Sequence, residues 1–136
     1  MKALLADDTP MIRRLIEIHL KKFGFEVSTA ANGTEALMHL DNSKFDIIML
    51  DLMMPEIDGF EVLRHIRSQG PNRGTPVIIL TAFGDVNNVV KAASLGASDF
   101  LVKPVDQNVL REKVSNAIGL RLQTDGDAVS RNSADS

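Results

Sequence analysis

The chain has 136 residues, 44% of them hydrophobic, which allows one domain with a single core and excludes a largely disordered protein. It contains no Cys, so disulfides, thiol nucleophiles and thiolate zinc sites are excluded. The net charge of −3 argues against nucleic acid as a direct partner, because phosphate binding requires a basic face.

No apolar run approaches the ~20 residues that cross a bilayer. Near the N-terminus, Asp7 and Asp8 interrupt the apolar run that a signal peptide would need. We therefore expect a cytoplasmic protein that does not insert into membranes.

Short apolar runs alternate five times with helical repeats of apolar residues. The apolar runs predict strands at residues 2–6, 25–30, 47–50, 77–80 and 99–102. The helical repeats predict helices at residues 10–23, 34–40, 58–68, 85–95 and 106–118. Because crossovers between parallel strands are right-handed, this alternation predicts a parallel sheet with helices on both faces.

The helix expected at residues 85–95 has apolar residues on one side, which is typical of a helix that packs through one face. These residues are Val86, Val89, Val90 and Ala93. Residues 121–136 lose the apolar repeat, so we predict one domain over residues 1–120, followed by a polar, disordered tail.

The most informative stretch is the segment FDIIMLDLMMPEIDG at residues 45–59. Its unbroken apolar run predicts a strand buried on both faces, and Asp51 follows directly after that run. Pro55 and Gly59 then turn the chain away. In open α/β sheets, ligands bind at the carboxyl ends of the strands, so Asp51 stands where a functional carboxylate is expected.

Polar side chains also follow three other predicted strands. Asp7 and Asp8 follow the first, Thr81 the fourth and Lys103 the fifth. Taken singly, each is better explained by a helix cap, a strand or turn position, or a surface charge. Together, at one edge of one sheet, they predict a site. Crowded carboxylates favour Mg²⁺, beside which a carboxylate can attack phosphorus while an amine and a hydroxyl bind phosphoryl oxygens.

These motifs resemble the receiver domain of two-component response regulators. The resemblance covers roughly residues 1–120. It implies an α/β, flavodoxin-like fold, with a doubly wound five-stranded parallel sheet of strand order 2-1-3-4-5 and five helices. The matching motifs are Asp7-Asp8, Asp51 before Leu-Met-Met-Pro-x-x-Asp-Gly, Thr81-Ala82, and Phe100-Leu-Val-Lys103-Pro104.

The resemblance implies that Asp51 accepts a phosphoryl group. The donor would be a sensor histidine kinase or a histidine phosphotransfer protein. Asp8, Asp51 and the backbone carbonyl of Met53 would bind Mg²⁺ directly, and Asp7 would act through water. On this interpretation the chain is a phosphoacceptor signalling protein that catalyses only its own phosphorylation and dephosphorylation.

The resemblance also implies roles for residues on the last two predicted strands. Lys103 would pair with the phosphoryl group, and the Lys103–Pro104 peptide bond would be cis. Thr81 and Phe100 would form a switch. Their movement would reshape the surface of the fourth helix, fifth strand and fifth helix for a downstream protein target.

Two side chains bear on the lifetime of the phosphoryl group. In the family geometry, Met53 and Phe83 flank the approach of a hydrolytic water, because they lie two positions after Asp51 and Thr81. Neither side chain can orient a water, and Phe83 is large enough to cover the site. We therefore predict slow self-dephosphorylation.

Other functions use similar residues. A phosphatase of the haloacid dehalogenase class needs a second Asp two residues after the nucleophile, where this chain has Met53. A flavin or nucleotide module needs a phosphate loop after the first strand, where Asp7 and Asp8 would repel phosphate. A receiver-fold adaptor that acts independently of phosphorylation stays open. So do the identity of the kinase, the target and pathway, the oligomeric state, and whether the chain is a natural single-domain regulator or part of a longer one.

Overall fold

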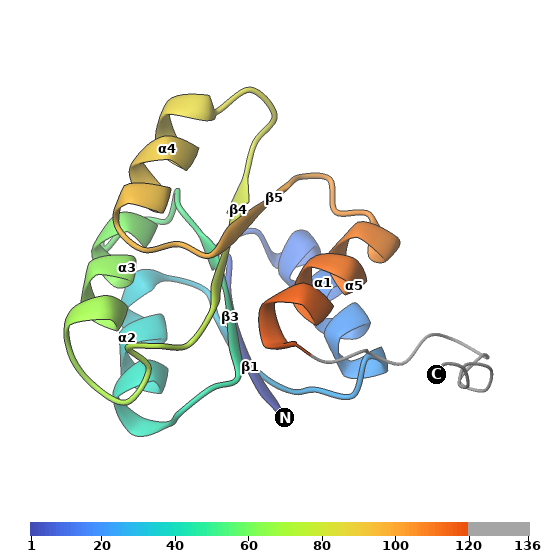
Figure 1. Ribbon diagram of the computed structural model, residues 1–136, viewed down its shortest axis with the longest axis horizontal. Helices are drawn as coiled ribbons and strands as arrows, with labels where there is room; N and C mark the ends of the chain where they lie inside the picture. Colours follow the sequence, from blue (N-terminus) through green and yellow to red (C-terminus); the bar gives the residue numbers. More distant parts are fainter. Residues whose placement is uncertain (120–136) are drawn as a thin grey trace.

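The fold is one parallel sheet with helices on both faces (Figure 1). The computed structural model describes residues 1–119, so the predicted tail at residues 121–136 lies outside the described residues. The strands are β1 (Lys2–Ala6), β2 (Glu26–Ala30), β3 (Ile47–Asp51), β4 (Val77–Thr81) and β5 (Asp99–Val102). The helices are α1 (Pro10–Lys22), α2 (Gly33–Asn42), α3 (Gly59–Ser68), α4 (Val86–Ser94) and α5 (Gln107–Ile118). Within residues 1–119, no helix has the length and apolarity to cross a membrane.

The strands lie in the order β2-β1-β3-β4-β5, which confirms the predicted flavodoxin-like arrangement. β3 is central and all its residues are buried, as its apolar run predicts. Helices α1 and α5 cover one face of the sheet, while α2, α3 and α4 cover the other (Figure 1). Chain order reverses between β1 and β3, which is where open α/β sheets form a ligand crevice at their carboxyl edge.

Side-chain caps set the starts of three helices. The Asn32 side chain accepts a hydrogen bond from the backbone N–H of Glu35 at 2.8 Å. Helix α2 therefore begins at Gly33 and ends at Asn42, which makes it longer than the helix predicted at residues 34–40. Asp58 and Asp106 cap α3 and α5 in the same way.

The start of α3 lies against the end of β3. A Cβ at Gly59 would come within 2.4 Å of the Asp51 carbonyl oxygen. The Gly59 N–H donates to the Leu52 carbonyl at 3.0 Å. Because no side chain fits there, glycine is required for α3 to begin this close to the strand. The backbone that follows Asp51 is thereby held in place.

The apolar side predicted for α4 does not face the core. Ala92 is the buried residue of this helix, whereas Val86 and Val90 are 64% and 62% exposed. Apolar residues occupy more than one side of α4, so periodicity alone does not select the buried one. The small Ala92 side chain allows α4 to approach the sheet closely, and the larger valines are left at the surface.

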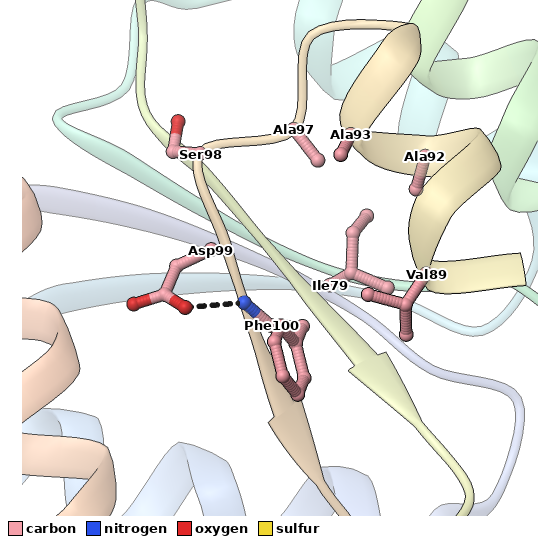
Figure 2. Close-up of a pocket in the computed structure, with 8 residues that line it drawn as sticks. All are labelled: Ile79, Val89, Ala92, Ala93, Ala97, Ser98, Asp99 and Phe100. Carbon is pink, nitrogen blue, oxygen red and sulfur yellow. Dashed lines mark hydrogen bonds between the residues drawn. The ribbon is translucent and has the colours of Figure 1, made fainter. Parts of the chain in front are cut away.

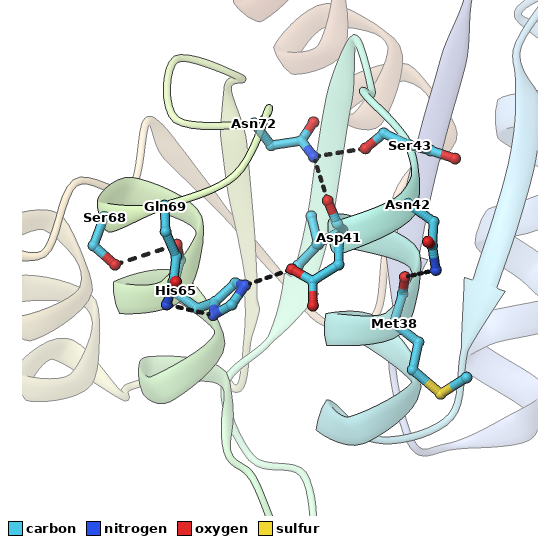
Figure 3. Close-up of polar contacts among 9 residues, drawn as sticks. Met38, Asp41, Asn42, Ser43, His65, Ser68, Gln69 and Asn72 are labelled. Atoms are coloured by element: carbon cyan, nitrogen blue, oxygen red, sulfur yellow. Dashed lines mark hydrogen bonds and ion pairs between the residues drawn. The ribbon is translucent and has the colours of Figure 1, made fainter.

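Asn72 joins two loops at the opposite, amino edge of the sheet (Figure 3). It is 1% exposed, and its Oδ1 accepts a hydrogen bond from the Phe45 N–H at 2.8 Å. Its Nδ2 donates to the carbonyls of Leu40 and Ser43 at 3.2 and 2.8 Å. Asn72 therefore satisfies backbone groups that the end of α2 would otherwise leave unpaired.

Arg67, near the end of α3, joins two further loops. Its Nε donates to the Gly96 carbonyl at 2.9 Å, just after α4. Its Nη1 donates to the carbonyls of Arg73 and Thr75 at 2.9 and 2.7 Å, before β4. The planar guanidinium thus connects the C-terminal end of α4 to the α3–β4 loop.

Candidate functional site

The side chains selected from the sequence meet at the carboxyl edge of the sheet. Asp7 and Asp8 follow β1, Asp51 ends β3, Thr81 ends β4 and Lys103 follows β5. Carboxylate oxygens of the three Asp residues lie within 4.8 Å of one another. A pocket of about 230 Å³ opens here, lined in part by Asp8, Asp51, Met53, Thr81 and Lys103.

Asp7 is fully buried and fixed on both sides. Its Oδ1 accepts a hydrogen bond from the Thr9 N–H at 2.8 Å, and its backbone carbonyl accepts one from Arg13 at 2.8 Å. Its Oδ2 lies 2.9 Å from Lys103 Nζ and forms an ion pair with it. The bond to Thr9 is a local turn before α1 and does not cap the helix, and it accounts for only one oxygen of Asp7.

Asp51 is 4% exposed, which is unusual for an acid. Its Oδ1 accepts a hydrogen bond from the Met53 N–H at 3.1 Å, and its Oδ2 lies 3.3 Å from Lys103 Nζ. Lys103 thus bridges the two buried carboxylates of Asp7 and Asp51. One ammonium offsets one of three neighbouring negative charges, so the site favours a further cation.

Burial raises the pKa of Asp51 from 3.8 to about 6, because removal from water penalises the charged carboxylate. The Met53 N–H and Lys103 oppose this rise in pKa, and the negative charge of Asp7 adds to it. For Lys103, desolvation lowers the pKa, but contacts with Asp7 and Asp51 outweigh it and the net pKa is raised. Near neutral pH the site therefore combines the charged amine of Lys103 with the Asp51 carboxylate, whose pKa lies about one unit below that pH.

The donor set fits Mg²⁺. Thr81 Oγ1 is a buried atom that makes no hydrogen bond within residues 1–119, and such an atom calls for a ligand or water. Carboxylate and carbonyl oxygens are the ligands that Mg²⁺ takes, together with several waters. Asp8, Asp51 and the Met53 carbonyl would hold the ion directly, and Asp7 through water. These metal-binding roles stay predictions.

The prediction that Phe83 covers the acidic pocket is wrong in this structure. Phe83 is 91% exposed and lines a separate hollow with Phe100, because the loop after β4 turns its side chain outward. Asp85 lines the acidic pocket instead, and the sequence analysis missed it. Its position directly before α4, where a cap is expected, was the available signal.

Phe100, the predicted switch residue, is 40% exposed and does not line the acidic pocket. It lies between two hollows. One, of about 250 Å³, is bounded by α4 and by β4 and β5 (Figure 2). The other, of about 510 Å³, extends toward α5. The Lys103–Pro104 peptide bond is cis, as the resemblance implied.

Comparisons with known proteins agree on one family. The sequence model of the family described as "Response regulator receiver domain" matches residues 3–115. The chain is 39% identical over 120 residues to the response regulator protein PilR of Pseudomonas aeruginosa, and the match covers 88% of this chain and 26% of PilR. Other curated relatives, including one from Galdieria sulphuraria, carry the name "Probable transcriptional regulator ycf27". This chain spans between 26% and 48% of the length of such relatives.

Solved structures agree with the fold. The chemotaxis protein CheY4 of Vibrio cholerae superposes with a TM-score of 0.80 at 34% identity, covering 85% of this chain and 97% of CheY4. The receiver domain of the sensor histidine kinase PA1611 from Pseudomonas aeruginosa has a TM-score of 0.80 at 30% identity, covering 87% and 97% of the two chains. That structure has a magnesium ion coordinated in its active site cleft.

Proposed function

This chain belongs to the response regulator receiver domain family, and on that premise we propose that it accepts a phosphoryl group on Asp51. One observation carries the proposal. Asp51 ends the central strand beside two further acids, a bridging Lys103 and the unpaired hydroxyl of Thr81. An acid cluster held only for stability would not leave a buried hydroxyl beside it without a hydrogen bond.

In the proposed reaction, an Asp51 oxygen attacks the phosphorus of a phosphohistidine on a sensor kinase or a phosphotransfer protein. The new P–O bond forms as the P–N bond breaks, and the histidine ring keeps the electron pair. Lys103 Nζ, 3.3 Å from Asp51 Oδ2, is close enough to bind a phosphoryl oxygen. Mg²⁺, when bound, offsets the repulsion between the phosphoryl group and its anionic acceptor.

The same proposal gives Thr81 and Phe100 their role as a switch. The Thr81 hydroxyl would donate a hydrogen bond to a phosphoryl oxygen and draw the following loop inward. The Phe100 ring would then move into the hollow bounded by α4. The surface of α4, β5 and α5 would change shape and engage a downstream protein. The free Thr81 hydroxyl and the open hollow support this sequence of events.

The partners and location of the whole protein stay predictions. We expect a histidine kinase or phosphotransfer protein as donor and a protein as target. Several relatives are named transcriptional regulators, so the prediction of no direct nucleic acid binding is confined to the receiver domain. The predicted cytoplasmic location also stays a prediction.

Phosphorylation of Asp51 is our first testable prediction. After treatment with acetyl phosphate and Mg²⁺, intact-mass analysis should show one added phosphoryl group, and Asp51→Asn should remove it. Asp58→Asn is the matched control, because it also removes one carboxylate from the same segment and Asn caps helices as well as Asp. An adduct that persists in Asp51→Asn would place the acceptor elsewhere.

A further inference from the structure

We propose that Lys113 and Asp99 act as a charged latch that holds the Phe100 ring in its outward position. This inference rests on the proposed function of Phe100 as the switch residue. The latch consists of Lys113 on α5, Asp99 at the start of β5, and the neighbouring Phe100 ring.

The first observation is that Lys113 reaches residues on both sides of β5. Side chains of consecutive strand residues point to opposite faces, so Asp99 and Phe100 lie on different sides of the sheet. Lys113 Nζ lies 2.9 Å from Asp99 Oδ1 and 5.1 Å from the centre of the Phe100 ring. The Lys113 side chain therefore extends around the edge strand and contacts the switch residue.

The second observation concerns Asp99 itself. Its Oδ1 accepts a hydrogen bond from the Phe100 N–H at 2.8 Å (Figure 2). The same oxygen also accepts a hydrogen bond from the Lys113 ammonium at 2.9 Å. One oxygen thus ties Lys113 to the backbone of the switch residue. The side chains of Lys113 and Asp99 are 27% and 34% exposed, so water screens their charges only in part.

The third observation is that there is open space beside the Phe100 ring. The hollow beside Phe100 has a volume of about 250 Å³ and is lined mainly by small or apolar side chains, among them Val89, Ala92 and Ala97. An apolar cavity of about 150 Å³ is known to admit benzene. The hollow therefore does not account for the outward position of the ring, and we assign that role to the contact with Lys113.

The contact of an ammonium with a ring face is such a contact. It stabilises by roughly 0.5–1 kcal/mol at exposed sites, and it is lost when the ring moves away from Lys113. Removing the charge should therefore raise the ratio of inward to outward ring about two- to fivefold before any phosphoryl group is present. By linkage, the variant should also gain phosphoryl affinity, by at most the same factor.

The test is Lys113→Met, which keeps an unbranched apolar stem and removes the charge. In NMR spectra of unphosphorylated protein, nuclear Overhauser contacts from the Phe100 ring to Val89 and Ala92 should strengthen. Lys113→Arg should show the same Phe100 contacts as wild type, because a guanidinium also binds carboxylates and ring faces. Asp99→Asn should shift the ring in the same direction by a smaller amount.

Lys2→Met is the matched control, because Lys2 Nζ lies 5.8 Å from the Phe45 ring, a similar contact away from the switch. It should leave Phe100 unchanged. An unchanged ring position in Lys113→Met, or the same shift in Lys113→Arg, would overturn the latch. Phosphoryl uptake, measured in parallel by mass, tests the proposed function separately, since the ring position is read without phosphate.

Discussion

Asp51 illustrates at the scale of one residue how burial prepares a functional group at a cost in stability. Its carboxylate is almost inaccessible to water, yet two of its neighbours are also acids. A pKa of about 6, against 3.8 in the open chain, means that the folded state without metal binds its proton more tightly than the unfolded state. The function proposed for Asp51 and the stability of the fold therefore make opposite demands on this side chain.

A pH dependence of stability follows from that pKa. Between pH 3.8 and about 6 the folded state holds more protons at Asp51, so the free energy of unfolding falls as pH rises. Above about pH 6 the free energy of unfolding is lower by roughly 3 kcal/mol, and below pH 3.8 this loss is absent. Urea unfolding in chelator should show Asp51→Asn more stable than wild type at pH 7 and equal to it near pH 3.5. Parallel stability curves would contradict the raised pKa.

Thr81 offers a residue-scale test of signal transmission. Because its buried hydroxyl has no hydrogen-bond partner within residues 1–119, Thr81→Ala should change the free energy of unfolding by less than about 1 kcal/mol. It should still accept the phosphoryl group, yet show smaller amide shifts in α4 and near Phe100. Thr81→Ser keeps the hydroxyl and should behave as wild type. Equal shifts in Thr81→Ala and wild type would mean that the switch runs by another route.

At the scale of the elements, α4 marks the limit of prediction from sequence. In α1, by contrast, the large side chains of Ile16 and Leu20, one turn apart, form the buried side. In α4 the apolar residues are valines and alanines on more than one side of the helix, and the buried residue is the small Ala92. The outward orientation of the Phe83 side chain could not be predicted from the sequence either, because it depends on a loop whose conformation has no periodic signal.

The loop network around Asn72 yields an element-scale prediction. Asn72→Ala should lower the free energy of unfolding by about 2–4 kcal/mol, because it leaves the Phe45 N–H and the carbonyls of Leu40 and Ser43 without partners. Asn42→Ala is the matched control, since Asn42 makes one exposed hydrogen bond within α2 and should change stability by less than ~0.5 kcal/mol. Comparable urea midpoints for both variants would contradict the role of Asn72.

Across the whole molecule, the sheet and the gathering of polar side chains at its carboxyl edge could be predicted because both depend on local signals. Apolar runs mark the strands, and in a parallel sheet their polar ends must gather at one edge. The networks of Asn72 and Arg67 could not be predicted. They join loops separated by up to 32 residues, and no sequence period connects such partners.

Metal binding gives a prediction for the stability of the whole molecule. A ligand that binds only the folded state at about 100 times its dissociation constant stabilises by ~2.7 kcal/mol. Mg²⁺ should therefore raise the melting temperature of wild type but not of Asp8→Ala. Without Mg²⁺, Asp8→Ala should be at least as stable as wild type, because one repelling carboxylate of the cluster is gone.

The control is Glu26→Ala, which removes an exposed acid outside the cluster and should keep the full response to Mg²⁺. A melting temperature of Asp8→Ala that rises with Mg²⁺ as much as that of wild type would remove Asp8 from the metal site.

The bonds of Arg67 give α4 two unequal ends. Its C-terminal end is fastened through the Gly96 carbonyl to α3, while the side chain of Asp85 at its N-terminal end accepts no hydrogen bond from the helix backbone. Because its C-terminal end is held, α4 should move by tilting about that end. We therefore expect small displacements beside Thr81 to grow along α4 away from Gly96, so that the half carrying the exposed Val86 travels farthest.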